Sequence, residues 1–438
     1  MGLSGYEVLV MTSISPIILG IGPLRRFLIN HLRITYILSL TGFVAFYYKQ
    51  PEYRLFVTGA GVGFSCLALT AGFFAERSNP ARLDGRISGF SLGLLASSIT
   101  KFACYTNNPV WPVMHAENGG WNKTGLGLAA IAVLISTRKG THAQDISAAK
   151  SKNGPFILIS LGLAGMFFAF HSLLADSSTM ISWVWDGYPI TGPMAVPDGV
   201  YVLLAMGFGH IIGSYFEAFG RSWTFFGVGS VAVGVFYANH GWLGFYGALV
   251  FATYMMAIAP SFIRVAIQHG PAKTFGTAFL FYNLLVLANI WTVAYAFVPG
   301  GPLLRERTDL VTSAMMVCIG AGVFATTSFN NSSNGKPLNS KHTSPIQRRV
   351  KSYFMHVLVA LELVAIAIAY IRSPPASHVP YNKEHKVVSA GIWTVHFGID
   401  NDMWSSERRM RDLIKEMEVD IIGMSSGIQK CVSIAYKN

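Results

Sequence analysis

Twelve long apolar runs occupy most of the 438-residue chain, and they decide what it can fold into. A helix needs about 20 apolar residues to cross the hydrocarbon core of a bilayer. A spanning helix also satisfies its own backbone hydrogen bonds where no water is present. We therefore predict an all-α polytopic membrane domain over residues 1–371, with about twelve transmembrane helices. Because the fifth run is short and the eighth follows the seventh closely, eleven or thirteen spans stay open. The runs lie near residues 7–24, 33–48, 55–75, 87–106, 124–137, 155–175, 200–219, 223–239, 242–263, 274–298, 309–328 and 352–371.

Composition agrees with a membrane protein, since 52% of the residues are apolar, 12% are charged and the mean hydropathy is +0.44. In so apolar a chain the net charge of +12 is expected in loops at one membrane face. We therefore expect membrane lipids as partners and no nucleic acid. The widely spaced cysteines form no CxxC pair, so they predict neither a zinc site nor a disulfide. They are Cys66, Cys104, Cys318 and Cys431.

Lysine and arginine are divided unevenly between alternate loops, with 18 in the odd-numbered loops and 5 in the even-numbered ones. Because basic loops stay in the cytosol, both termini are predicted to be luminal. Asn122, in the sequon NKT, is then luminal and available for glycosylation, whereas Asn330 and Asn331 stay cytosolic and unmodified. The longest even-numbered loop, 175–199, is acidic and rich in aromatic residues and proline. It is typical of a luminal lid or of an interfacial aromatic belt.

Ionisable side chains inside the apolar runs are candidates for function because they are costly in lipid. His210 and Glu217 are seven residues apart in one run and are predicted to share a helical face. Glu362 lies deep in the last run, with His356 a turn and a half earlier. These residues predict a polar groove that binds a lipid head group or conducts protons. The alternative is that they form hydrogen bonds within the helix bundle.

A second set of candidates falls near the predicted luminal surface: His171, Asp176, Asp186 and His240. A histidine beside a carboxylate can act as a general base in transfer reactions of lipid hydroxyl, acyl or phosphoryl groups. The alternative is a structural or interfacial role for all four residues.

A short soluble unit is predicted at residues 388–424, after a linker at 372–387. The stretch VVSAGIWTVHFG is typical of a buried strand, and VDIIGM is typical of a second one. Between them, Ser405 or Ser406 is a candidate N-cap, and one helical face collects Met410, Leu413, Ile414 and Met417. A β-α-β unit of this size cannot cover both faces of its sheet, so we expect an incomplete α/β fragment, followed by a divergent tail at 425–438.

The words GIWTVHFGIDNDMW and ERRMRDL in this unit resemble the GPI-anchor ceramide-remodelling proteins of the calcofluor-white-hypersensitivity class. The stretch HSLLADSSTMISWVWDGYPITGPM at 171–194 resembles the membrane module of the same family. The resemblance implies a protein of the endoplasmic reticulum that replaces the diacylglycerol-type lipid of a GPI anchor with ceramide. It also implies GPI anchors and other GPI-remodelling membrane proteins as partners. The alternative is a polytopic lipid transporter or scramblase without covalent chemistry.

The unit departs from the wider endonuclease/exonuclease/phosphatase pattern at its metal-binding positions. Thr394 stands where an Asn is expected and Ser426 where a Glu is expected, and later His and Asp residues of the pattern would lie beyond Asn438. His396, Asp400 and Asp402 resemble family site positions; alternatively, His396 packs behind the sheet and the two Asp shape a turn. We expect no metal site and no cofactor in this chain, with a divalent metal only in a complete domain. The family implies a transferase or hydrolase, and this chain is expected to be inactive alone.

Overall fold

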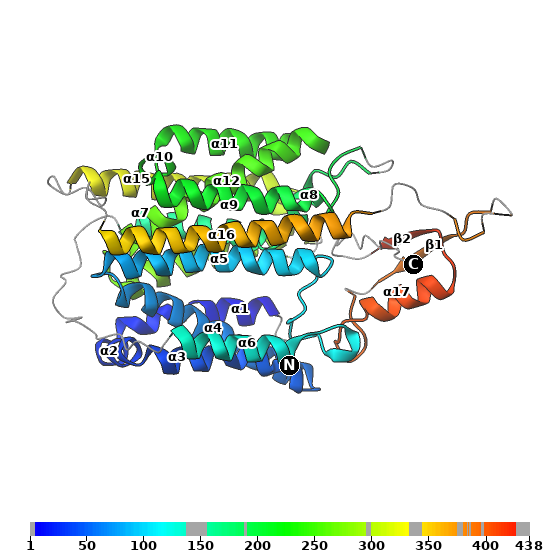
Figure 1. Cartoon of the computed structure of the whole chain (residues 1–438), viewed down its shortest axis with the longest axis horizontal. Coiled ribbons are helices and arrows are strands. Elements are labelled where there is room, and N and C mark those ends of the chain that lie inside the picture. Colours follow the sequence, from blue (N-terminus) through cyan, green and yellow to red (C-terminus); the bar gives the residue numbers. More distant parts are fainter. Residues whose placement is uncertain are drawn as a thin grey trace.

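The computed structural model describes residues 5–136, 156–187, 191–294, 299–332, 344–374, 380–382, 384, 387–395 and 398–425. Within these ranges the chain folds into a long bundle of helices with a small α/β unit at one end (Figure 1). The predicted tail, with Ser426, and the candidate His396 lie outside the described residues.

The first group of helices is α1 (Gly5–Ser13), η1 (Ser15–Gly20), α2 (Gly22–Asn30), α3 (Leu32–Ser39), η2 (Leu40–Tyr47), α4 (Pro51–Ala75), α5 (Pro80–Ala103), η3 (Ala116–Asn118) and α6 (Asn122–Ser136). The second is α7 (Phe156–Ser172), α8 (Ser177–Trp183), α9 (Gly199–Tyr215), α10 (Glu217–Gly220), α11 (Trp223–Ala238), α12 (Gly241–Ala266), η4 (Ala272–Gly276), α13 (Thr277–Trp291), α14 (Gly301–Leu304) and α15 (Thr308–Ser332). Helix α16 (Pro345–Arg372) follows the second group.

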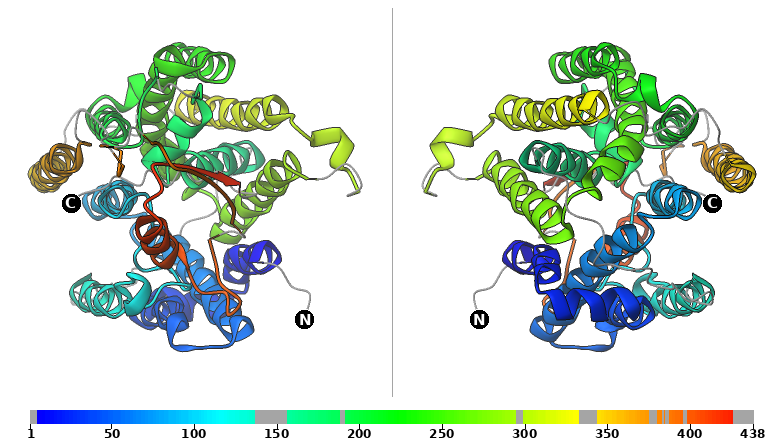
Figure 2. Two further views of the ribbon diagram at one scale, coloured as in Figure 1. Left: turned by 90° about the vertical axis from the view of Figure 1, so that its right-hand side faces the viewer. Right: turned by 90° about the vertical axis from the view of Figure 1, so that its left-hand side faces the viewer.

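The two groups meet along α5, which packs on α9 of the second group and on α16. Figure 2 looks along the helices and shows the blue and cyan first group on one side of the molecule and the green and yellow second group on the other. The main core belongs to the second group, where α7 packs against α12, α13 and α15. A Cβ atom on Gly162 would lie 2.5 Å from the Cα atom of Gly322, so glycine at this crossing lets α7 and α15 approach closely.

Each of the twelve predicted ranges contains helix, but the described helices do not establish twelve spans. Five are long and apolar enough to cross a membrane: Pro51–Ala75, Gly241–Ala266, Ala272–Trp291, Thr308–Phe329 and Pro345–Arg372. Two further candidates are bent pairs, with α7 and α8 at 87° and the segment Gly5–Gly20 and α2 at 102°. The other ranges hold shorter or more polar helices. The structure therefore supports a multi-pass membrane protein with five to seven candidate spans.

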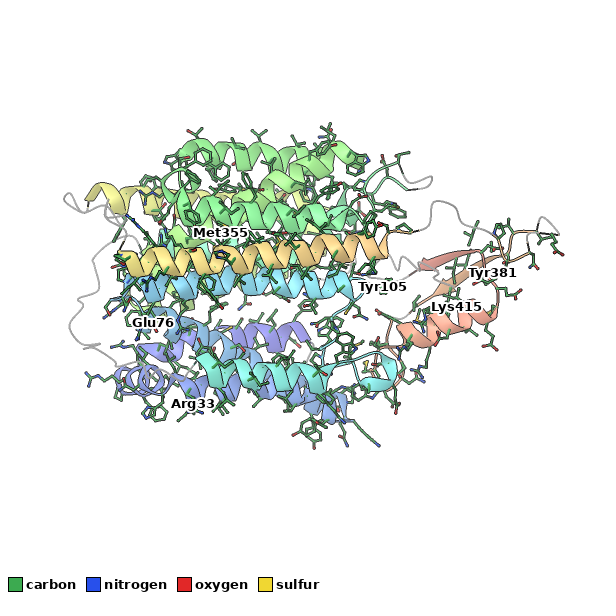
Figure 3. The ribbon with its side chains drawn as sticks, viewed as in Figure 1. Arg33, Glu76, Tyr105, Met355, Tyr381 and Lys415 are labelled. Atoms are coloured by element: carbon green, nitrogen blue, oxygen red, sulfur yellow. The ribbon has the colours of Figure 1, made fainter. Side chains whose placement is uncertain are left out.

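The two ends of the bundle are formed by different residues. Arg33 and Glu76 lie at one end, and Tyr105, Tyr381 and Lys415 lie at the other (Figure 3). We call the first the basic end, after Arg33. The ion pair between Arg264 and Asp84, with Nη2 2.6 Å from Oδ1, also lies at this end. We call the second the docking end, because the α/β unit contacts the helices there.

The α/β unit contains β1 (Ala390–Thr394), α17 (Glu407–Glu416) and β2 (Ile421–Ser425). The strands pair in parallel, with Ala390 opposite Ile421 and Thr394 opposite Ser425. Helix α17 buries Met410 and Ile414, while Leu413 and Met417, which were predicted to share its apolar face, are 41% and 64% exposed. A sheet of two described strands covers only part of that face.

Candidate functional site

The loop between α5 and α6 holds the α/β unit at the docking end. The backbone amide of Ser405 donates to the carbonyl of Val113 over 3.1 Å. Asn118 returns a 3.1 Å hydrogen bond from its side-chain amide to the carbonyl of Ser405. The side-chain amide of Asn107 lies 2.5 Å from Oε2 of Glu407, at the first turn of α17. Three contacts from one loop therefore fix the segment that leads into α17.

Arg54, in the first turn of α4, clamps the same segment from the other side. Its guanidinium donates to the carbonyls of Asp402 at 2.7 Å and Met403 at 3.1 Å. The same group lies 3.8 Å from the centre of the Trp404 ring, and His115 meets that ring edge to face at 4.9 Å. Arg54 is 3% exposed, so the cation–π contact and its hydrogen bonds are shielded from water. We call these contacts, with those of Asn107 and Asn118, the docking contact.

Asp400 shapes the turn that presents Trp404, in agreement with the alternative interpretation of this residue. Its Oδ1 accepts backbone hydrogen bonds from Asp402 at 3.0 Å and Trp404 at 2.8 Å, and its Oδ2 lies 2.5 Å from Arg409. Partial burial acts to raise the pKa of Asp400, but these hydrogen bonds and the Arg409 guanidinium hold it below its ordinary value. The side chain of Asp402 is exposed, and its carbonyl is the group that binds Arg54.

The described residues of the α/β unit do not fit a divalent metal. Both carboxylate oxygens of Asp400 are already engaged by protein donors. Thr394 ends β1, where the wider pattern has an Asn. Across the described ranges of the chain, no three His, Cys, Asp or Glu side chains lie close enough together to hold a metal ion.

His171 and Asp176 lie near the docking end but serve different contacts. His171, near the end of α7, is exposed, and its Nδ1 lies 2.8 Å from the hydroxyl of Tyr282. Asp176 caps α8 by accepting from the amide and the hydroxyl of Ser178, both at 2.9 Å. Lys101 lies close enough to His171 for an electrostatic interaction, and its Nζ donates to the carbonyl of Ala175 at 2.8 Å.

Asp186 lies near the backbone at the start of α12, where His240 is also located. A Cβ atom on Gly241 would lie 3.8 Å from Oδ2 of Asp186, and His240 is the N-cap residue of that helix. Both side chains are exposed. The predicted set of four therefore divides, because no hydrogen bond or ion pair of the described residues joins His171 to Asp176, Asp186 or His240.

The predicted common face of His210 and Glu217 is wrong, because α9 ends at Tyr215 and Glu217 begins a separate short helix. Glu217, 3% exposed, forms an ion pair with Arg264 and accepts a 3.3 Å hydrogen bond from Ser261. Arg264 also pairs with Asp84, which accepts a 3.2 Å hydrogen bond from Gln347. Glu217 thus belongs to a buried ion-pair network that joins α5, α10, α12 and α16 at the basic end, as the alternative interpretation requires.

Glu362 and His210 retain unused hydrogen-bonding capacity. A Cβ atom on Gly207 of α9 would lie 1.9 Å from Oε1 of Glu362, so glycine is needed where this carboxyl group packs. Both Glu362 oxygens, and Nδ1 of His210, are buried and have no hydrogen-bond partner among the described residues. Nε2 of His210 lies 3.4 Å from the hydroxyl of Ser214, one turn later in α9.

The structure argues against the predicted glycosylation of Asn122. This residue is 3% exposed at the start of α6. Its Nδ2 atom, to which a glycan would be attached, donates to the carbonyls of Trp111 at 3.0 Å and Met114 at 2.5 Å. A glycan would displace both hydrogen bonds and could not be accommodated in this packing.

Comparison with known proteins decides the family. Models of three PGAP2IP domains match the chain: the first transmembrane domain over residues 1–135, the second transmembrane domain over 152–333 and the C-terminal nuclease-like domain over 385–436. The chain is also 36% identical to Protein cwh43 of Schizosaccharomyces pombe over 440 residues. The chain belongs to the Cwh43-like PGAP2IP family. The alignment covers 97% of this chain and 44% of Protein cwh43, so the chain spans less than half the length of that relative.

The matched domains show which parts of the chain the docking contact joins. Arg54, Asn107 and Asn118 belong to the first transmembrane domain, whereas Trp404 and Glu407 belong to the nuclease-like domain. Helix α16 lies between the second transmembrane match and the nuclease-like match, and the guanidinium of its last residue, Arg372, lies 3.5 Å from the centre of the Tyr105 ring. The docking contact and the contact of Arg372 with Tyr105 therefore both involve the loop that follows α5.

The sequence alone did not identify Arg54, Tyr282 or Lys101 as candidate residues of the docking end. Arg54 had a usable signal, since it is one of only 5 basic residues in the even-numbered loops. Tyr282 had none, because a tyrosine in an apolar helix is common and its bond to His171 joins distant parts of the chain.

Proposed function

We propose that this chain acts in GPI-anchor lipid remodelling at the endoplasmic reticulum membrane, where the diacylglycerol-type lipid of the anchor is replaced with ceramide. Family membership supports the proposal. The observation that carries it is the docking contact, because Arg54 and the loop after α5 hold the nuclease-like segment against the end of a membrane domain. A reaction on a membrane-anchored lipid needs its soluble groups at the membrane face, and this contact supplies that placement.

In this proposal the transmembrane domains bind the anchor and present its lipid to the nuclease-like domain. The docking end offers two separate sets of polar groups for a phosphate and sugar head group: His171 with Tyr282 and Lys101, and Asp186 near the start of α12 with His240. The proposal assigns the chemistry to the nuclease-like domain, which residues 385–436 of this chain match. The predicted topology puts both termini, and hence the docking end, in the lumen.

One observation is also compatible with the alternative of lipid transport without covalent chemistry. An apolar hollow of about 510 Å³ lies between α11 and α12. Its lining includes Val228, Val231 and Val250, which are exposed and suited to an acyl chain. Such a hollow would serve a transporter or scramblase as well as a remodelling protein.

Lipid analysis after deletion of the gene for this chain separates the two functions. Remodelling predicts that GPI anchors lose ceramide and retain diacylglycerol-type lipid, while the leaflet distribution of bulk phospholipids stays the same. Transport predicts that the ceramide content of the anchors stays the same, while the leaflet distribution of bulk phospholipids changes. Anchors with unchanged ceramide content in the deletion strain would contradict the proposed function.

A further inference from the structure

Three arginines from different segments gather around the end of α4, at the basic end of the bundle. Arg77 follows α4, and its guanidinium lies 4.1 Å from the centre of the Phe74 ring. Phe74 packs in one apolar cluster with Leu24, the neighbour of Arg25 in α2. Arg86 of α5 reaches back over Gly72, where an added Cβ atom would lie 2.5 Å from its Nη1. The three guanidinium groups thus share one region of the surface.

Described carboxylates do not balance this positive charge. Glu76 lies 3.6 Å from Arg86 and 3.9 Å from Arg82. Among the described residues, no ion pair involves Arg25 or Arg77. Partial burial, and then the charge of the neighbouring Arg25, lower the pKa of Arg77, which is the response of a cation that lacks a counter-ion.

Two of the arginines also have buried donors that are not used. The Nε atoms of Arg25 and Arg86 are inaccessible to water and have no hydrogen-bond partner among the described residues. Arg25 directs Nη1 to the carbonyl of Leu19 at 3.4 Å, and Arg86 directs Nη1 to the hydroxyl of Tyr36 at 2.6 Å. These bonds orient each guanidinium while leaving the Nε donor free. An unpaired buried donor on a charged group is costly, so an arrangement of this kind indicates a missing acceptor.

We propose that Arg25, Arg77 and Arg86 bind the phosphate of an anionic phospholipid at the basic end. Arginine presents planar, always charged donors that match phosphate oxygens, and basic pockets between transmembrane helices are suited to anionic head groups. The flank of the cluster supports a lipid over a free ion, because Ile21, whose carbonyl accepts from the amide of Arg25, is 58% exposed and offers apolar contact to an acyl chain. This inference does not depend on the proposed function.

Native mass spectrometry of the whole chain, released from nanodiscs, tests the proposal. Phosphatidylcholine nanodiscs with and without phosphatidic acid are compared for the wild type, Arg25→Gln, Arg77→Gln and the double variant. The matched control is Arg26→Gln, which removes an exposed charge from the next position of α2. Because one charge-assisted hydrogen bond contributes enough for roughly a tenfold change in affinity, each single variant should retain phosphatidic acid at least about tenfold less. The control should retain it as the wild type does.

Thermal unfolding in detergent separates a binding site from a structural cluster. Without anionic lipid, Arg77→Gln should unfold close to the wild-type temperature, because the loss of repulsion from Arg25 offsets the loss of the contact with Phe74. Added phosphatidic acid should then stabilise the wild type and Arg26→Gln, but not Arg77→Gln. Inorganic phosphate is the second ligand tested: stabilisation by phosphate alone, with no retained lipid, would overturn the lipid assignment. Equal retention of phosphatidic acid by Arg77→Gln, Arg25→Gln and Arg26→Gln would overturn the proposal.

Discussion

The guanidinium of Arg54 lies 3.8 Å from the centre of the Trp404 ring, and this contact joins the first transmembrane domain to the nuclease-like domain. Arg54 also binds the backbone within the turn at residues 400–404, through the carbonyls of the consecutive residues Asp402 and Met403. One buried side chain therefore combines a cation–π contact with two charged hydrogen bonds. Removing it should release the nuclease-like segment while the helices stay folded.

Replacement of Arg54 with alanine should weaken the docking contact by about 2–4 kcal/mol, from the loss of a desolvated cation–π contact and charge-assisted hydrogen bonds. Hydrogen exchange should accelerate at residues 398–410 and stay unchanged in α7 and α12. Arg307→Ala is the control, because Arg307 is 51% exposed and its ion pair within the described part of the chain is with Asp309. Unchanged exchange at residues 398–410 in Arg54→Ala would show that the loop after α5 holds the segment without Arg54.

Breaking the buried network at the basic end should destabilise the bundle strongly. Arg264→Met leaves the buried carboxylates of Glu217 and Asp84 without their arginine, which typically costs about 3–5 kcal/mol. Thermal unfolding in detergent should show a large decrease for Arg264→Met and a smaller one for Glu217→Gln, because Arg264 keeps its ion pair with Asp84 in that variant. Arg409→Gln is the comparison, since it removes an ion pair whose arginine is 68% exposed and should cost under about 1 kcal/mol. A small effect of Arg264→Met would contradict a structural role for this network.

Acid should loosen the turn at residues 400–404. The pKa of Asp400 is lower in the folded chain than in the unfolded chain, so its ionised form contributes stability above its unfolded pKa. That contribution is lost as the pH falls through the folded pKa, below the ordinary range of aspartate near about 4. Exchange of the Asp402 and Trp404 amides should therefore accelerate in acid, and Asp400→Asn should remove this pH dependence. A pH profile shared by the wild type and Asp400→Asn would assign the titration to another group.

Asn122 should carry no glycan. Its side-chain amide is buried and donates to two carbonyls of the preceding loop. Glycosidase treatment should leave the gel mobility of the chain unchanged, and Asn122→Gln should migrate as the wild type does. A mobility shift that depends on Asn122 would show that the loop between α5 and α6 is packed differently in the cell.

The apolar runs predicted where helices lie, because helix length in a bilayer and the chemistry of apolar residues are local properties. They could not fix the number of spans, because bends such as the one between α7 and α8 depend on packing. The same limit explains the break after Tyr215, which separates Glu217 from His210. An unbroken helical pattern in the sequence does not reveal that Arg264 holds Glu217 in place.

The candidate site was less predictable than the fold, because its contacts join residues far apart in the chain. The motif IDND identified Asp400 and Asp402 as candidates, and the structure shows that Asp400 accepts hydrogen bonds within the turn. No local pattern could pair Trp404 with Arg54, or His171 with Tyr282. The sequon at Asn122 was equally uninformative about burial, since the carbonyls that bind it belong to Trp111 and Met114.

The most direct test of the account is mass spectrometry of GPI-anchor lipids from cells whose only copy of this gene carries Arg54→Ala. If lipid remodelling depends on the docked nuclease-like segment, the ceramide content of the anchors should fall toward that of the deletion strain, while cells with Arg307→Ala keep the wild-type content. Anchors with normal ceramide in Arg54→Ala cells, at a normal level of the protein and with the segment shown to be released, would contradict the account.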